Sequence, residues 1–192
     1  MPPVHVHLVR HGQSEWNLIG RLQGQTAHPG LTTLGREQAQ QAAAAIVGLV
    51  QEPAAIWSSD LTRAVQTADV IGSALGLAVR QDVALREQAL GSLEGTLTST
   101  LRAEQPPMGM HVGDVRWGGG ESTADVYARV GRFLARELPA APEHLVVVSH
   151  GDTIRVARAW LQRRSHRDLE WDEIRNGMVV TVVVPDAAAL SR

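Results

Sequence analysis

The stretch VHVHLVRHG, residues 4–12, sets the architecture of the chain. Its first residues alternate between the two sides of an extended chain, Val4, Val6 and Leu8 on one side, so we predict a β-strand over 4–9. The strand ends abruptly in Arg10, His11 and Gly12. A guanidinium and an imidazole side by side at the end of a first strand raise the question of which ligand they share.

Helical and strand-like patterns alternate along the rest of the chain. Periodicity and cap residues predict helices over about 33–50 (capped by Thr33), 61–75, 122–138 (opened by a Ser122/Asp125 capping box) and 152–161. Apolar runs predict strands over 54–57, 77–79, 145–149 and 178–184. This alternation is typical of one doubly wound α/β domain, 1–192, with a mostly parallel sheet. Residues 84–121 are irregular, because PPMGM and WGGGE break any long element.

The composition narrows the chemistry. The chain has 192 residues, 44% of them hydrophobic and 20% charged, which is enough for one domain with a sizeable core. All 18 basic residues are Arg and there is no Cys, which excludes lysine chemistry, cysteine nucleophiles and disulfides. A net charge of −2 predicts neither a nucleic-acid nor a membrane partner. Without a signal peptide or a long apolar run, we expect a cytoplasmic protein.

Polar residues follow three of the predicted strands at the point where each strand ends. They are Arg10-His11-Gly12, then Ser58-Ser59-Asp60 with Arg63 one helical turn later, and His150-Gly151. Ligands of doubly wound sheets bind beyond the carboxyl ends of the strands, so these side chains are expected in one crevice.

An anion suits this crevice. A guanidinium fork matches phosphate oxygens, which makes Arg10 and Arg63 natural clamps. Gly12 and Gly151 carry no Cβ, so the backbone is expected to approach a ligand closely there. Nearby cations would also keep His11 in its neutral, nucleophilic form.

Motifs spread over most of the chain resemble those of the histidine phosphatase superfamily, in its phosphoglycerate-mutase-like group. They are VRHGQSEWN (9–17), RLQG (21–24), LTTLGREQA (31–39), SSDLTRAVQTA (58–68), LREQALGSLEG (85–95), GGGES (118–122) and VVSHGDTIR (147–155). The resemblance implies a three-layer αβα sandwich. It also implies metal-independent phosphoryl transfer without a cofactor.

The resemblance implies a role for each matching residue. His11 would be the nucleophile that forms a phosphohistidine, and Glu87 would protonate the leaving oxygen and then activate water. The residues implied to bind the phosphoryl group or substrate are Arg10, Asn17, Gln23, Gly24, Arg63, His150 and Gly151. The irregular segment at about 95–121 would cover the pocket, with Trp16, Trp117, Met108, Met110 and His111 as candidates for its rim. The loop QTAHPGLT departs from the family pattern at Ala27–Gly30, a change expected at the substrate rim.

Alternative interpretations exist for several of these residues. Glu94 lies in the same loop as Glu87, so either carboxylate could face the pocket. Glu121 could be only a charge at a helix N-terminus. The His-x-His spacing of His5 and His7 would suit a metal shared with His150 and Asp152, although polar groups on a sheet face are the simpler interpretation.

A phosphomonoesterase acting on a sugar phosphate or a phosphoglycerate-like metabolite is the favoured function. The short span between Gly95 and Gly118 and the absence of lysine disfavour a phosphoglycerate mutase. A phosphate-binding module without turnover is the non-enzymatic alternative. The partner is then a small phosphomonoester, and a homodimer is left open.

Overall fold

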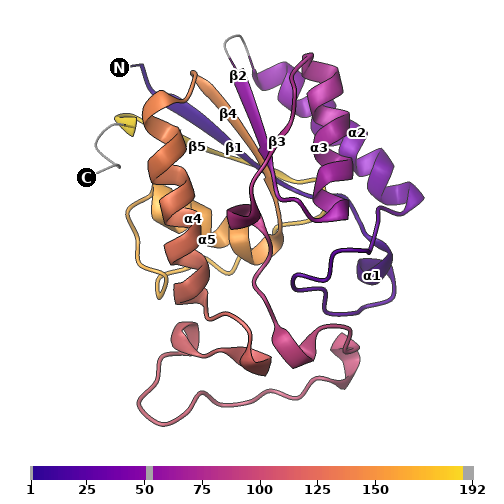
Figure 1. The fold of residues 1–192 in the computed structure, drawn as a ribbon, viewed down its shortest axis with the longest axis vertical. Coiled ribbons are helices and arrows are strands. Elements are labelled where there is room, and N and C mark those ends of the chain that lie inside the picture. The colour runs from indigo at the N-terminus through magenta and orange to yellow at the C-terminus, as the bar shows by residue number, and fades with distance from the viewer. Residues whose placement is uncertain (1, 51–53, 188–192) are drawn as a thin grey trace.

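The computed structural model describes residues 2–50 and 54–187, which fold into a five-stranded sheet between two layers of helices (Figure 1). The strands are β1 Val4–Arg10, β2 Ala54–Ser58, β3 Arg80–Gln81, β4 His144–Ser149 and β5 Val179–Val184. Their order is β3-β2-β4-β1-β5, and β5 runs antiparallel to β1 while the other pairs are parallel. The predicted αβα sandwich is confirmed. Within the described ranges, no helix has the length and apolar character needed to cross a membrane.

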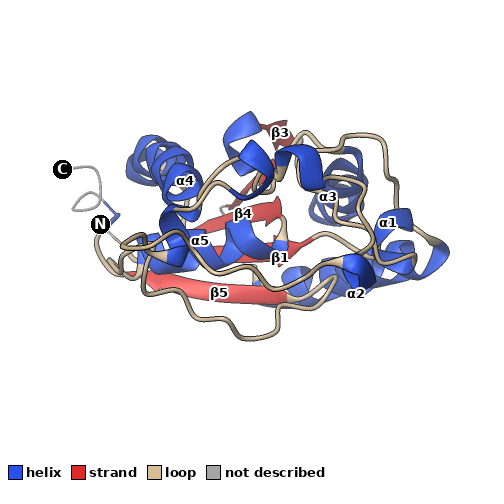
Figure 2. Cartoon of the chain, turned by 90° about the horizontal axis from the view of Figure 1, so that it is seen from below, coloured by secondary structure: helices blue, strands red, loops and turns tan. Residues whose placement is uncertain are grey.

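Helices flank the sheet on both sides (Figure 2). They are α1 Glu15–Leu18, α2 Thr33–Leu49, α3 Thr62–Leu75, α4 Thr123–Glu137 and α5 Gly151–Leu161. Helices α2 and α3 pack together over one face, and α4 and α5 pack over the other. The Ser122/Asp125 capping box is present at the start of α4, as the sequence predicted.

The alternation in β1 divides the core into two parts. Val6 and Leu8 are buried among the residues of α4 and α5, whereas Val9 is buried with those of α2 and α3. His7 shares the face of Val9 and is 1% exposed; its ring nitrogens lie 2.9 Å from Thr181 Oγ1 and 3.0 Å from His144 Nδ1. Both faces of β1 are therefore covered, as is typical of a strand inside a parallel α/β sheet.

Most predicted boundaries shift by about one residue, and two of the differences have a clear physical cause. Thr32, rather than Thr33, caps α2, because its Oγ1 accepts the Gly35 N–H at 3.0 Å. The edge strand lies at Arg80–Gln81 instead of 77–79. Gly76 ends α3 in the left-handed conformation (φ 68°), and the Leu77 N–H is still bonded to the α3 carbonyl of Gly72, so the chain pairs with β2 only afterwards.

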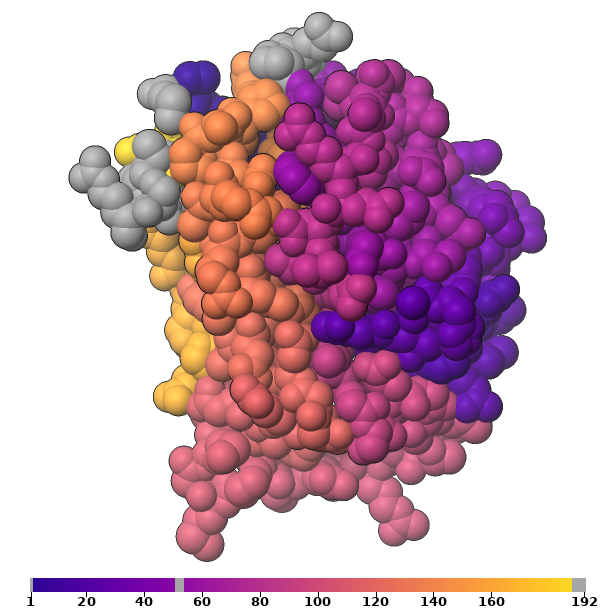
Figure 3. Space-filling view, viewed as in Figure 1, coloured from indigo at the N-terminus to yellow at the C-terminus, as the bar shows by residue number. Residues whose placement is uncertain are grey.

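The irregular segment contains short 3₁₀ turns and no long element. They are Val83–Leu85, Gly91–Leu93, Thr98–Thr100, Val112–Asp114 and Trp117–Gly119. The segment crosses the lower end of the molecule in Figure 1, beyond the carboxyl ends of the parallel strands, and forms the lower surface in Figure 3. It is therefore placed next to the residues that follow β1, β2 and β4.

Candidate active site

Two histidines meet where β1 and β4 end. The rings of His11 and His150 lie edge to face, with their centroids 5.0 Å apart. His11 is 2% exposed and His150 is fully buried. The parallel pairing of β1 with β4, which sets Arg10 opposite Ser149, brings the residues after both strands to the same edge of the sheet.

The tautomer of His11 follows from its one hydrogen bond. Its Nδ1 lies 2.7 Å from Gly12 O, and because a carbonyl only accepts, Nδ1 carries the proton. Burial lowers the pKa of His11 well below its usual value, and the charges of Arg63 and Arg10 lower it further. His11 is therefore neutral near pH 7, with the lone pair on Nε2.

Three buried nitrogens beside His11 have no hydrogen-bond partner in the described part of the chain: Arg10 Nε, Arg63 Nε and His150 Nδ1. The other nitrogens of Arg63 are bound, since Nη1 donates to Thr26 O and Nη2 to Gly24 O, both at 2.9 Å. Arg10 Nη1 donates to Ile174 O at 2.6 Å. Buried donors in proteins are nearly always paired, so three adjacent ones describe a preformed site for an anion.

Ser59 contacts the ring of His150. Its Oγ accepts the Leu61 N–H at 3.3 Å and lies 2.9 Å from His150 Nε2. When the Ser59 hydroxyl donates to Nε2, the ring proton lies on Nδ1 and is a donor toward the site, which is the tautomer that an anion requires. Burial, Arg63 and His11 all lower the pKa of His150, which keeps it a neutral donor. The sequence assigned Ser59 only to a helix start, but α3 begins later, at Thr62, without a side-chain cap.

Gly12 and Gly151, which lie next to these residues, differ in what surrounds them. A Cβ on Gly12 would lie 2.1 Å from Gly35 O, so close packing of α2 requires this glycine, rather than the ligand approach that we predicted. A Cβ on Gly151 would instead make ordinary contacts with two guanidiniums, 3.6 Å from Arg155 Nη1 and 3.7 Å from Arg10 Nε.

The loop before β5 also holds the backbone of His11 in place, which the sequence did not predict. Asn176 Nδ2 donates to His11 O at 3.0 Å, and Gly177 N donates to Arg10 O at 3.0 Å. Asn176 Nδ2 also lies 3.3 Å from Asn17 Oδ1. Asn176 precedes an ordinary strand and belongs to none of the motifs, so no sequence signal pointed to it.

Asn17, Gln23 and Gly24 make polar contacts around the start of α1 and Arg63, and their role in binding substrate stays a prediction. Ser14 N donates to Asn17 Oδ1 at 3.1 Å, and Ser14 Oγ donates to Gln23 Oε1 at 2.7 Å. Gly24 contributes its carbonyl to Arg63, at a backbone φ of 47° that favours glycine. Their described contacts therefore orient the loop that holds Arg63 and the start of α1.

Glu87 lies at the N-terminus of α5. Its Oε1 accepts from Thr153 N at 3.2 Å and from Thr153 Oγ1 at 3.1 Å, and its Oε2 accepts from Asp152 N at 3.3 Å. Burial and the nearby Glu87 carboxylate raise the pKa of Asp152 to about 6. Two carboxyl groups thus lie together at the N-terminus of α5.

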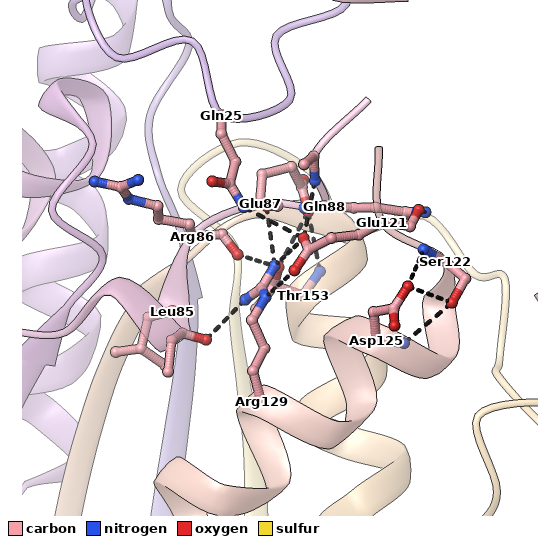
Figure 4. A network of polar contacts seen from close by, with 12 residues as sticks. Gln25, Leu85, Arg86, Glu87, Gln88, Glu121, Ser122, Asp125, Arg129 and Thr153 are labelled. Atoms are coloured by element: carbon pink, nitrogen blue, oxygen red, sulfur yellow. Dashed lines mark hydrogen bonds and ion pairs between the residues drawn. The ribbon is translucent and has the colours of Figure 1, made fainter. Parts of the chain in front are cut away.

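A buried ion pair fixes the loop that carries Glu87 (Figure 4). Arg129 donates from Nε to Glu121 Oε1 at 2.8 Å and from Nη2 to Glu87 O at 3.0 Å. Burial alone would raise the pKa of Glu121, but the bonds from Arg129 and Ala89 N lower it below its usual value. Glu121 is therefore more than the helix-terminal charge that we predicted.

Glu94 is occupied in a different contact. Its Oε1 accepts from Gln25 N at 2.9 Å and from Leu90 N at 3.1 Å, and its Oε2 accepts from Thr26 Oγ1 at 2.8 Å. Of the carboxylates in this loop, Glu94 fastens the segment whose carbonyls hold Arg63. Glu87 instead faces the helix that starts after His150.

The profile of the histidine phosphatase superfamily (branch 1) matches residues 6–189. The chain belongs to this superfamily. Over 168 residues it is 38% identical to glucosyl-3-phosphoglycerate phosphatase of Mycobacterium tuberculosis, covering 80% of this chain and 73% of that protein. It is 37% identical over 176 residues to the probable phosphoglycerate mutase GpmB of Salmonella typhi, covering 84% and 79%.

Solved structures agree with this assignment. The mycobacterial glucosyl-3-phosphoglycerate phosphatase in complex with VO3 matches with a TM-score of 0.82 and 32% identity, over 93% of this chain and 92% of that one. Phosphoserine phosphatase of Entamoeba histolytica, in complex with 3-phosphoglyceric acid, matches with a TM-score of 0.77 and 27% identity, over 93% and 89%. The chain is thus a phosphatase of the phosphoglycerate-mutase-like kind.

The rim candidates of this histidine phosphatase separate into two groups. Trp117 lines a cavity beside the site, whereas Met108 and Met110 are exposed, at 103% and 45%. Trp16 packs edge to face against His28, with centroids 5.3 Å apart. The Ala27–Gly30 departure from the family pattern therefore changes the wall around Trp16.

The metal alternative does not fit this histidine phosphatase. His5 pairs with His144 at the start of β4, whereas His150 follows the end of that strand. The rings of His5 and His144 are stacked, with centroids 5.1 Å apart, rather than directed at a common point. Among the described residues no group of three potential ligands is arranged to hold a metal ion. His5 and His7 are polar groups of the sheet.

Proposed function

We propose that this phosphatase hydrolyses small phosphomonoesters through a phosphohistidine formed on His11. The observation that carries the proposal is the set of three unpartnered buried nitrogens, on Arg10, Arg63 and His150, around a neutral imidazole. Phosphoryl transfer needs a placed nucleophile and donors for the equatorial oxygens, and these residues supply both.

Each step uses a residue already described. His11 Nε2 attacks phosphorus, the bond to the leaving oxygen breaks, and Glu87 gives that oxygen a proton. Water then attacks the phosphohistidine, Glu87 takes a proton from the water, and the bond from phosphorus to His11 breaks to release phosphate. Arg10, Arg63 and His150 hold the oxygens throughout.

The test is the pair of variants His11→Ala and His5→Ala. His11→Ala is expected to abolish hydrolysis of a phosphomonoester and to lose the acid-labile phosphoryl label, because the nucleophile is gone. His5→Ala changes a histidine at the opposite end of β1, away from the site, and should keep both. A His11→Ala enzyme with near-normal turnover would exclude the proposed nucleophile.

Transfer to a second substrate is the other candidate, because one relative is named a probable phosphoglycerate mutase. Hydrolysis and 3-phosphoglycerate isomerisation are to be measured with and without 2,3-bisphosphoglycerate. Isomerisation faster than hydrolysis would favour the mutase. Tight phosphate binding without any turnover would favour the binding module.

Other features of the protein stay predictions. The segment 95–121 is proposed to cover the substrate within one domain, because it crosses the end of the sheet that carries the site. The predicted extent 1–192 includes residues 1, 51–53 and 188–192, which lie outside the described ranges. The cytoplasmic location and the homodimer are proposals from the sequence alone.

A further inference from the structure

A cavity of about 300 Å³ lies on the acid side of the site. Gln88 and Asp152 line it, and these residues flank Glu87: one is its neighbour in sequence, and the other donates its backbone N–H to Glu87 Oε2. An alcohol that receives a proton from Glu87 would leave toward this cavity. Its lining therefore bears on which alcohols the enzyme accepts.

The lining of this cavity is mostly apolar. Leu22, Leu90, Leu93, Val112, Trp117 and Trp171 supply most of it. The indole of Trp171 is 67% exposed and is held in place by the guanidinium of Arg155, which lies 5.5 Å from its ring centroid. Flat indole surfaces of this kind pack well against a ring with an apolar face.

Asp152 is the one ionisable residue among the described residues that line the cavity, and it is an acid. Both terminal nitrogens of the nearby Arg155 are engaged, since Nη1 donates to Asp152 Oδ1 and Nη2 to Asp172 O, both at 2.8 Å, and its Nε is buried without a partner in the described chain. A larger cavity of about 710 Å³ shares Leu93 and Trp117 with the first one and carries one charge of each sign, Arg102 and Glu104. The described lining of the cavity beside Glu87 thus presents no cation to a carboxylate on the leaving group.

We propose that the leaving group of the preferred substrate is an uncharged alcohol with an apolar ring face, and that the cavity disfavours alcohols with a carboxylate. This proposal rests on the proposed phosphatase function and narrows its substrate class. A carboxylate placed here would meet the Asp152 carboxylate in a partly dry site, where like charges repel strongly. A ring would instead cover Trp171 and Trp117.

Three alkyl phosphates separate charge from ring packing. Glycerol 3-phosphate and 3-phosphoglycerate differ in the carboxylate, and benzyl phosphate adds a ring to a similarly basic leaving oxygen. We expect kcat/KM to be highest for benzyl phosphate and on the order of tenfold lower for 3-phosphoglycerate than for glycerol 3-phosphate.

Two variants test which residues cause the preference for a ring and the discrimination against a carboxylate. Trp171→Ala should lower kcat/KM for benzyl phosphate by roughly tenfold and leave glycerol 3-phosphate nearly unchanged, whereas Val47→Ala, at an exposed apolar position of α2, should change neither. Asp152→Asn should narrow the difference between the two glycerol-derived substrates, whatever it does to the absolute rate.

The outcomes distinguish the two proposals. If 3-phosphoglycerate is hydrolysed as well as glycerol 3-phosphate or better, the substrate class is wrong and the phosphatase function stands. A ratio unchanged in Asp152→Asn, or equal losses for all substrates in Trp171→Ala, also overturns the assignment of the cavity. If none of the three esters is hydrolysed, the proposed function fails and this inference fails with it.

Discussion

The substitution Arg63→Met removes one guanidinium from the phosphate site while keeping a side chain of similar length. Arg63 is fully buried, and its Nε lacks a partner in the described chain while its other nitrogens hold Thr26 O and Gly24 O. Removing one preorganised donor from a transition-state site costs about 10²–10³ in kcat, and we expect that loss here.

The effect on stability should be smaller than the effect on rate. The variant loses two hydrogen bonds from a charged donor, each about 1.5–3 kcal/mol, but it also no longer buries a charge, and that relief is of similar size. We therefore expect the free energy of unfolding, measured in urea, to fall by less than about 3 kcal/mol. The variant should remain folded at room temperature.

The pH dependence gives a second, independent readout. After burial, Arg63 is the main cause of the lowered pKa of His11. Without it the pKa of His11 rises, so protonation disables the nucleophile at higher pH. The acid limb of kcat/KM should then move to higher pH. Arg132→Met, at an exposed position on α4, is the control. A rate within tenfold of the wild type, or an acid limb that moves to lower pH, would refute this reasoning.

Three further substitutions test the framework around the site. Gly12→Ala places a Cβ 2.1 Å from a backbone oxygen of α2 and should destabilise the fold by about 1–3 kcal/mol in urea; an unchanged unfolding midpoint would contradict this packing. Ser59→Ala should lower kcat/KM by up to about tenfold by freeing the His150 tautomer, with Ser59→Thr keeping most activity; equal losses in both would argue against it. The pKa of buried His7 is lowered from 6.5 to about 4, by burial and then by His144 and His5, so on acidification the unfolded chain binds a proton at His7 before the folded chain does. The free energy of unfolding should have its full value above pH 6.5 and fall by up to about 3 kcal/mol as the pH drops toward 4. In urea unfolding at these two pH values, His7→Gln should show a smaller fall.

The sequence predicted the helices and strands that have a clear hydrophobic pattern, and it missed the position of the strand that depends on pairing with a neighbouring strand. The runs that became β1 and β4 are apolar because both faces of the sheet are covered there, so the amino-acid sequence alone reveals them. Strand β3 is only Arg80–Gln81, and its position depends on where α3 unwinds relative to β2. No local pattern carries that information. The antiparallel direction of β5 likewise follows from the route of the chain after α5.

The same distinction applies to the site. Residues that would touch phosphate are of unusual types at strand ends, so Arg10, His11 and His150 stand out in the sequence. Residues that hold them, such as Ser59 and Asn176, are ordinary polar residues whose contacts span 91 and 165 positions of the chain. Their importance appears only once the strands are placed side by side.

The proposed selectivity for the leaving alcohol depends on residues whose positions the sequence does not predict. The cavity beside Glu87 takes most of its wall from segments without a helical or strand period, and its charge depends on which arginines are already paired. Composition alone suggests an abundance of cations, since 18 arginines are present. In the structure, Arg155 is bound to Asp152 and Arg129 to Glu121, and the described lining of this cavity contains no arginine. Under the proposed function we therefore expect the phosphate to be recognised by charge and the alcohol by shape, so that changing the apolar wall should alter substrate choice without altering the chemistry at His11.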